Sequence, residues 1–105
     1  MRMVHVDTAE EWRGGQVLLH RLLRELHEKG EEVWLAAPSS GRLWEKCGFL
    51  GERRVSIAEG WSIRGLMRIR RVQPDLVVAH TSHAHGMSLL AGGRLVVHRW
   101  VDLRF

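Results

Sequence analysis

Cysteine is nearly absent from this sequence, and long apolar runs are missing altogether. Cys47 stands alone among 105 residues, so no internal disulfide can form, and the chain is expected to be cytoplasmic. No apolar run approaches the roughly 20 residues that a membrane-spanning helix needs. The opening segment, residues 1–7, is too short and turns polar too soon for a signal peptide. Cys47 is therefore expected to act as a small apolar side chain.

Several nucleotide-binding and hydrolase signatures are missing as well. Gly14-Gly15 is not part of a G-x-G-x-x-G fingerprint, and no Walker lysine follows it. This disfavours classical NAD binding and P-loop hydrolysis. No G-x-S-x-G elbow is present, so nucleophilic hydrolysis by a serine has no positive support.

The charge balance favours anionic partners without selecting one of them. Lysine and arginine number 16 against 12 aspartates and glutamates, which gives a formal net charge of +4 with seven histidines uncounted. Phosphorylated substrates, acidic lipid surfaces and nucleic acid all fit such a balance.

Apolar and amphipathic segments alternate along the whole chain. We expect strands at residues 1–6, 32–37, 53–58, 75–79 and 94–100, and helices at 16–29, 41–47, 62–73 and 82–91. Strands that alternate with helices at this spacing indicate a parallel sheet with helices on both faces. The prediction is one α/β domain, residues 1–105, with a doubly wound, Rossmann-like sheet of about five strands.

The helix expected at 16–29 has one leucine-rich face, and Gly30 is placed to end it. Residues 7–15 are expected to form a polar loop before it, and Ser39 or Ser40 to cap the next helix. The leucine-rich face consists of Leu18, Leu19, Leu22, Leu23 and Leu26.

Gly14 and Gly15 follow the first expected strand and open the first long helix. Bare backbone N–H groups at the positive end of a helix are a common binding place for phosphate. The functional interpretation is a diphosphate held by loop amides and the helix dipole. The alternative is a flexible turn that merely starts a helix.

The segment His80-Thr81-Ser82-His83-Ala84-His85 follows the fourth expected strand. A metal site is disfavoured, because no carboxylate lies nearby in sequence to complete the ligand set. In a second interpretation His80 donates hydrogen bonds to a sugar or phosphate, and His83 and His85 line the loop beside it. In a third, Thr81 or Ser82 caps a helix and the histidines are solvated.

Arginines recur at helical spacing in the helix expected at 62–73. Arg64, Arg68 and Arg71, with Arg70 adjacent, fit a nucleic-acid or acidic-membrane footprint, and equally a solvated outer face, which we favour. The helix is expected to turn three apolar side chains inward, namely Ile63, Leu66 and Met67. After the fifth strand, Arg99 either clamps a phosphate or acceptor group or forms an ordinary ion pair.

Five segments in this order resemble the amino-terminal domain of GT-B-fold glycosyltransferases of the GT4 type, which are retaining enzymes. The resemblance begins with Arg13-Gly14-Gly15-Gln16-Val17-Leu18-Leu19 and covers almost the whole length. One position departs from the pattern, because Trp100 stands where a second arginine is common. The other matching segments are residues 28–30, 31–38, 74–80 and 96–102.

The resemblance implies transfer of a sugar from a nucleotide-sugar donor to a sugar or lipid-linked acceptor. Gly14 and Gly15, with Arg13, would approach the donor diphosphate, and His80 would be the catalytic residue beside the transferred sugar. No cofactor and no metal are expected. The residues expected to contact substrate are Asp7, Trp12, His83, His85 and Arg99.

The family also has a second Rossmann-like domain, which binds most of the nucleotide. We therefore expect the chain to be the acceptor-side half, inactive alone, paired with a partner chain or a second copy. It is expected to be cytoplasmic or peripheral at the inner membrane face. The alternative is a non-catalytic binding or assembly module, which an exposed apolar edge after the fifth strand would favour. Nucleic acid is disfavoured as a partner.

Overall fold

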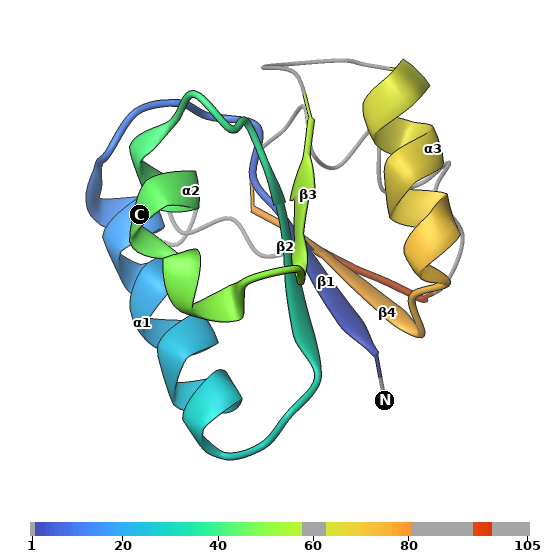
Figure 1. Cartoon of the computed structure of the whole chain (residues 1–105), viewed down its shortest axis with the longest axis horizontal. Helices are drawn as coiled ribbons and strands as arrows, with labels where there is room; N and C mark the ends of the chain where they lie inside the picture. Colours follow the sequence, from blue (N-terminus) through green and yellow to red (C-terminus); the bar gives the residue numbers. More distant parts are fainter. Residues whose placement is uncertain (1, 58–62, 81–93, 98–105) are drawn as a thin grey trace.

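The computed structural model of the chain describes residues 2–57, 63–80 and 94–97 (Figure 1). Two helices follow the first two strands, and a third helix stands between the third and fourth strands. The elements are β1 (Met3–Val6), α1 (Gly14–Glu28), β2 (Val33–Ala37), α2 (Arg42–Lys46), a short 3-10 turn η1 (Gly48–Leu50), β3 (Arg54–Ser56), α3 (Ile63–Val72), β4 (Leu76–Ala79) and β5 (Arg94–Val97).

All strand pairs are parallel, and the strands lie in the order β3-β2-β1-β4-β5. Helices α1 and α2 cover one face of the sheet and α3 covers the other (Figure 1). This is a doubly wound, Rossmann-like sheet, so the predicted fold class is confirmed. The helix expected at 82–91, the end of the strand expected at 94–100 and the surface after β5 lie outside the described residues.

The core has two layers, because successive side chains of a strand point to opposite faces of the sheet. On the α3 face, Val4 and Val6 pack with Ile69 and Val77, all of them fully buried. On the α1 face, the buried residues of β2 pack against both helices. This second cluster contains Leu19, Leu23, Val33, Leu35, Ala37, Leu43, Cys47 and Leu50.

The first helix begins two residues earlier than predicted, so Gly14 and Gly15 form its first turn rather than the end of the loop. Its end is as expected: Gly30 has φ +83, the left-handed conformation that ends many helices. The N-cap of α2 is Gly41, not Ser39 or Ser40. A Cβ on Gly41 would lie 3.1 Å from Cα of Glu10, so only glycine lets the two loops approach.

The prediction that Ile63 and Met67 lie on the inner face of α3 is wrong. Ile63 is 73% exposed and Met67 is 54% exposed. Gly65, Ile69 and Val72 are buried instead, because their spacing of four and three residues puts them on one side of the helix. Ile63 and Met67 therefore lie on the solvent side, among the arginines.

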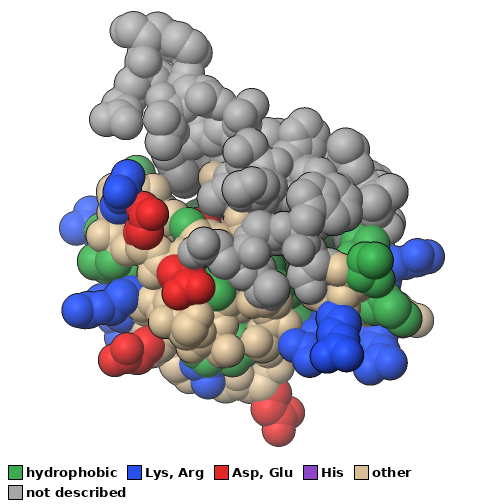
Figure 2. All heavy atoms as spheres, turned by 90° about the horizontal axis from the view of Figure 1, so that it is seen from above, with side chains coloured by type: hydrophobic (Ala, Val, Ile, Leu, Met, Phe, Trp, Pro, Cys, Tyr) green, Lys and Arg blue, Asp and Glu red, His purple; other side chains and the backbone are tan. Residues whose placement is uncertain are grey.

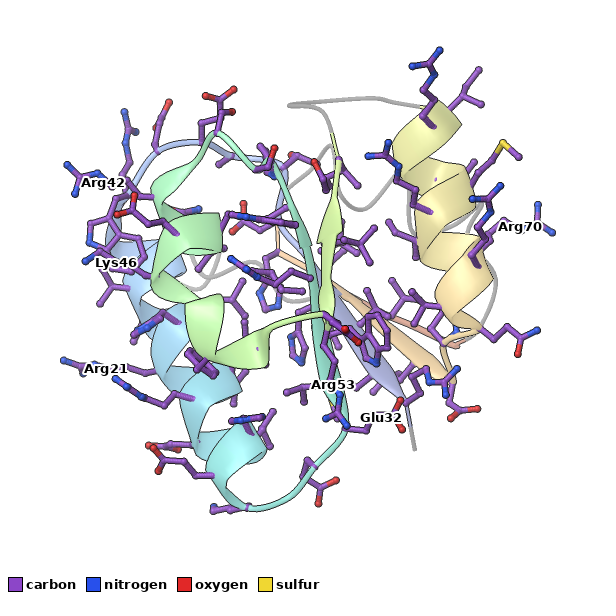
Figure 3. All side chains as sticks on the ribbon, in the orientation of Figure 1. Arg21, Glu32, Arg42, Lys46, Arg53 and Arg70 are labelled. Atoms are coloured by element: carbon purple, nitrogen blue, oxygen red, sulfur yellow. The ribbon has the colours of Figure 1, made fainter. Side chains whose placement is uncertain are left out.

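Arg2 joins three elements at the amino-terminal edge of the sheet. Its Nε lies 2.6 Å from Oε2 of Glu32, and its Nη1 donates to the carbonyl of Val72. Its backbone N–H donates to the carboxylate of Asp75 at 2.7 Å. Hydrogen bonds from Arg2 and Trp34 hold the pKa of Glu32 below its usual value. Figure 3 shows Glu32 beside Arg53 near this edge.

Cys47 is completely buried under α1, as expected for a small apolar side chain. Burial raises the pKa of its thiol to about 12, although Arg54 opposes the shift. We expect a thiol reagent to label native Cys47 only on transient opening, and to label it rapidly in urea. A Met67→Cys chain, whose new thiol is exposed, is the positive control. Rapid labelling of native Cys47 would contradict this burial.

None of the helices within residues 2–57 and 63–80 has the length and apolar composition of a membrane-spanning segment.

Candidate functional site

The carboxyl ends of β1 and β4 lie side by side at the point where the strand order reverses. Val6 pairs with Ala79, and the backbone N–H of His80 donates to the carbonyl of Val6 at 3.0 Å. Asp7 and His80 are the first residues beyond these two strands. In open parallel sheets this position is where ligands bind, so we take it as the candidate site.

Asp7 is 1% exposed, and both of its carboxylate oxygens are engaged. Oδ1 accepts the backbone N–H of Ala9 at 2.9 Å, and Oδ2 accepts a hydrogen bond from Nε2 of Gln16 at 3.0 Å. Oε1 of the buried Gln16 in turn accepts the backbone N–H of Arg13, the N-cap of α1, at 3.1 Å. This Asp7–Gln16–Arg13 relay fixes the loop between β1 and α1 at both ends.

The ionised form of Asp7 is unfavourable in this position. Burial raises the pKa of its carboxyl above 3.8, and the hydrogen bonds from Ala9 and Gln16 offset part of that shift. Because the folded state holds the proton more tightly, the contribution of Asp7 to stability is larger at low pH. It declines as the pH rises from 3.8 through the folded-state pKa.

Gly14 and Gly15 present the first turn of α1 at this edge. Neither has positive φ; among the described glycines only Gly30 and Gly51 do. A Cβ on Gly14 would meet no atom within 4 Å. The backbone conformation therefore does not require glycine at these positions, and Gly14 is exposed in the first turn, where helix N–H groups lack partners within the helix.

His80 lies on a second histidine. Its Nε2 is 3.0 Å from Nδ1 of His5, and the rings are within 20° of parallel with centroids 5.2 Å apart. Nε2 of His5 lies 3.2 Å from the sulfur of Met3. Both histidines are buried, so His5 fixes the ring of His80 at the end of β4. Among the described residues no three metal-ligating side chains form a group.

The rest of the loop is held from the α1 side. The ring of Trp12 packs on the buried cluster under α1 and meets His20 edge-on at 5.9 Å. The ammonium of Lys46 lies over the ring of Trp12, 5.1 Å from its centroid. Arg13 is exposed and forms an ion pair with Glu11 at 2.7 Å. The labelled Lys46 and Arg42 point outward from α2 on the same side of the molecule (Figure 3).

Six of the predicted site residues thus lie on the loop after β1, at the start of α1 or at the end of β4. His83, His85 and Arg99 lie outside the described residues. His5 and Gln16 were not among the residues predicted from the sequence. His5 is the one polar side chain inside an apolar strand, and Gln16 stands three residues after the N-cap, where an amide can close a capping box. Both residues could therefore have been recognised from the sequence, His5 by its apolar neighbours and Gln16 by its distance from the N-cap.

The sequence of the chain matches the model of Glycosyltransferase Family 4 over residues 12–101. The chain belongs to this family. The resemblance inferred from the five motifs is therefore confirmed. No curated protein and no solved structure matches the chain. As a glycosyltransferase family 4 domain, the chain has its first-turn glycines and His80 at one edge, and both fall inside the matched residues.

Proposed function

We propose that this family 4 domain is the acceptor-side half of a retaining glycosyltransferase, which moves a sugar from a nucleotide-sugar donor to a sugar or lipid-linked acceptor. The family match and the exposed Gly14, which opens α1 at the same sheet edge as His80, support this assignment. In this scheme a second Rossmann-like domain, on whichever chain it lies, binds most of the nucleotide. This domain alone then turns over little donor.

The proposed chemistry is electrostatic. As the bond between sugar and diphosphate breaks, negative charge develops on the leaving diphosphate. The N–H groups of Gly14 and Gly15 and the positive end of α1 stabilise that charge. His80 donates a hydrogen bond to the transferred sugar. Asp7 acts as a positioning residue, because its carboxylate is committed to Ala9 and Gln16.

Gly14 is the observation that carries the proposal. Glycine within a helix costs roughly 0.5–1 kcal/mol relative to alanine. Gly14 lies in the helix without positive φ, and a Cβ there would have open space around it. No neighbouring residue in the fold therefore excludes a side chain at this position. Close approach of a ligand to the backbone explains the missing side chain.

Changing Gly14 to leucine is expected to weaken diphosphate binding strongly without loss of stability. The new side chain enters the open space above the first turn and blocks the N–H groups. Calorimetric titration with inorganic pyrophosphate and with nucleotide-sugars measures the effect. We expect weak saturable binding by the natural chain, and at least about a tenfold loss in the variant, since one charge-assisted hydrogen bond contributes about 1.5–3 kcal/mol.

Gly48→Leu is the matched control, because Gly48 also faces open space and lies in η1, away from the site. This control is expected to bind as the natural chain does. Equal binding by Gly14→Leu would remove the diphosphate from the first turn of α1. Absence of binding by the folded natural chain would favour an assembly module without a donor contact of its own.

A further inference from the structure

Helix α3 carries charge of a single sign. Between Ile63 and Val72 all four charged residues are arginines, and no carboxylate is present. The exposed face of α1 differs, because there Arg21 and Arg24 are balanced by Glu25 and Glu28. Among the described residues, no ion pair involves an α3 arginine. The arginines of α3 are Arg64, Arg68, Arg70 and Arg71.

Two large apolar side chains lie among these cations. Ile63 and Met67 are four residues apart, so they lie one above the other on the outer face. Arg71 continues this row, and Arg70 lies three residues beyond Met67. Figure 2 shows basic side chains beside hydrophobic ones at the right of the molecule, where α3 lies in Figure 1.

The buried side of α3 holds the helix in this orientation. Ile69 is fully buried against the sheet, and Gly65 and Val72 are buried on the same side. Nη1 of Arg68 donates to the carbonyl of Ser56 in β3 at 2.7 Å. Because the helix cannot turn about its axis without breaking these contacts, the apolar pair and the remaining arginines stay directed outward.

From this arrangement we infer that the outer face of α3, formed by Ile63, Arg64, Met67, Arg70 and Arg71, docks the domain on an anionic lipid surface. Apolar side chains that enter the headgroup boundary, with arginines beside them on phosphate, are the chemistry of an interfacial helix. A polyanion such as nucleic acid would use the arginines but leave Ile63 and Met67 in water. This face of α3 lies on the opposite side of the sheet from α1, and its proposed role does not depend on sugar transfer.

Vesicle sedimentation tests both parts of this face separately. The natural chain is expected to bind vesicles of phosphatidylglycerol and phosphatidylcholine in equal parts, and not vesicles of phosphatidylcholine alone. Ile63→Ser with Met67→Ser keeps the charge and removes the apolar pair, and is expected to weaken binding about tenfold or more. Arg64→Gln with Arg71→Gln is expected to weaken it about 25-fold, roughly fivefold for each arginine.

The matched control is Arg21→Gln with Arg42→Gln, which removes the same charge on the far side of the molecule (Figure 3). We expect it to change vesicle binding by less than about twofold, because those charges lie beyond the screening length from the surface. All these positions are exposed, and circular dichroism checks that each variant is folded.

Three results would overturn the inference. They are absence of binding to the anionic vesicles, full binding by the Ile63→Ser, Met67→Ser chain, and an equal loss in the control. Full binding by that serine chain, together with a loss in the Arg64→Gln, Arg71→Gln chain, would identify a purely electrostatic surface for a polyanion. As an independent readout, an environment-sensitive dye can be attached to a Met67→Cys chain at position 67 alone, because Cys47 is buried. The fluorescence of this dye is expected to shift to the blue on anionic vesicles, because position 67 enters the headgroup boundary.

Discussion

Replacing Gln16 by glutamate is expected to lower the free energy of unfolding by about 3 kcal/mol at neutral pH, because it sets a second carboxylate against buried Asp7. In the natural chain Nε2 of Gln16 donates to Oδ2 of Asp7 over 3.0 Å. The variant has two acceptors at that distance and no donor between them. Urea unfolding followed by circular dichroism measures the loss.

The pH dependence of this variant gives a second measure. Burial already raises the pKa of Asp7, and a second carboxylate raises the pKa of the pair further. The lost stability should therefore return as the pH falls and the two groups come to share a proton. A loss that is the same at pH 5 and at neutral pH would contradict electrostatic repulsion as its cause.

A compensating change separates the relay from simple packing. With Asp7→Asn added to Gln16→Glu, the new amide at position 7 can donate to the new carboxylate, which still accepts the N–H of Arg13. Asp7→Asn alone sets two NH₂ groups against each other. We expect the double variant to recover about 2 kcal/mol or more of the loss, as a coupling energy within one hydrogen-bond network. Losses that simply add would show that Asp7 and Gln16 act independently.

Replacing Leu19 by alanine is expected to cost about 2–5 kcal/mol, because the side chain is fully buried between α1 and β2. The loss is a large fraction of the roughly 5–15 kcal/mol that holds a typical domain folded. The midpoint of urea unfolding measures it. Where the alanine chain fails to fold, Leu19→Met, which keeps the volume, is expected to cost less than about 1.5 kcal/mol.

The matched control for Leu19→Ala is the same substitution at the preceding residue, Leu18. Leu18 was assigned to the same leucine-rich face, but it is 41% exposed. Leu18→Ala is therefore expected to cost about 0.5 kcal/mol or less. Similar losses at the two positions would mean that α1 is rotated on the sheet relative to the arrangement described above.

The strand and helix alternation predicted most of the fold, because buried parallel strands and amphipathic helices leave different apolar patterns in sequence. The face of α3 could not be predicted in the same way. That helix has two apolar rows, and only contact with the sheet decides that Ile69 is buried and Met67 is not. Leu18 shows a similar limit at the edge of a buried face.

The candidate site was partly predictable. Gly14, Gly15 and His80 follow from loop positions at the ends of expected strands. The contact between His5 and His80 joins residues 75 positions apart and depends on β1 lying next to β4. The burial of Asp7 also depends on tertiary packing, because the same carboxylate on a loop without packed neighbours would face solvent. Sequence patterns indicate which edge matters, while packing decides which side chains are open there.

The central place of β1 has a consequence for synthesis on the ribosome. Once β2 has emerged, β1 can pair with it, but its other edge has no partner until β4 follows, because Val6 pairs with Ala79. At roughly 5–20 residues per second, the stretch from the end of β2 to the end of β4 takes about 2–8 s to translate. During that time the nascent chain carries an unpaired, apolar strand edge, which is a template for aggregation. A chaperone that covers β1 on the emerging chain would therefore protect the same strand that later forms the middle of the sheet.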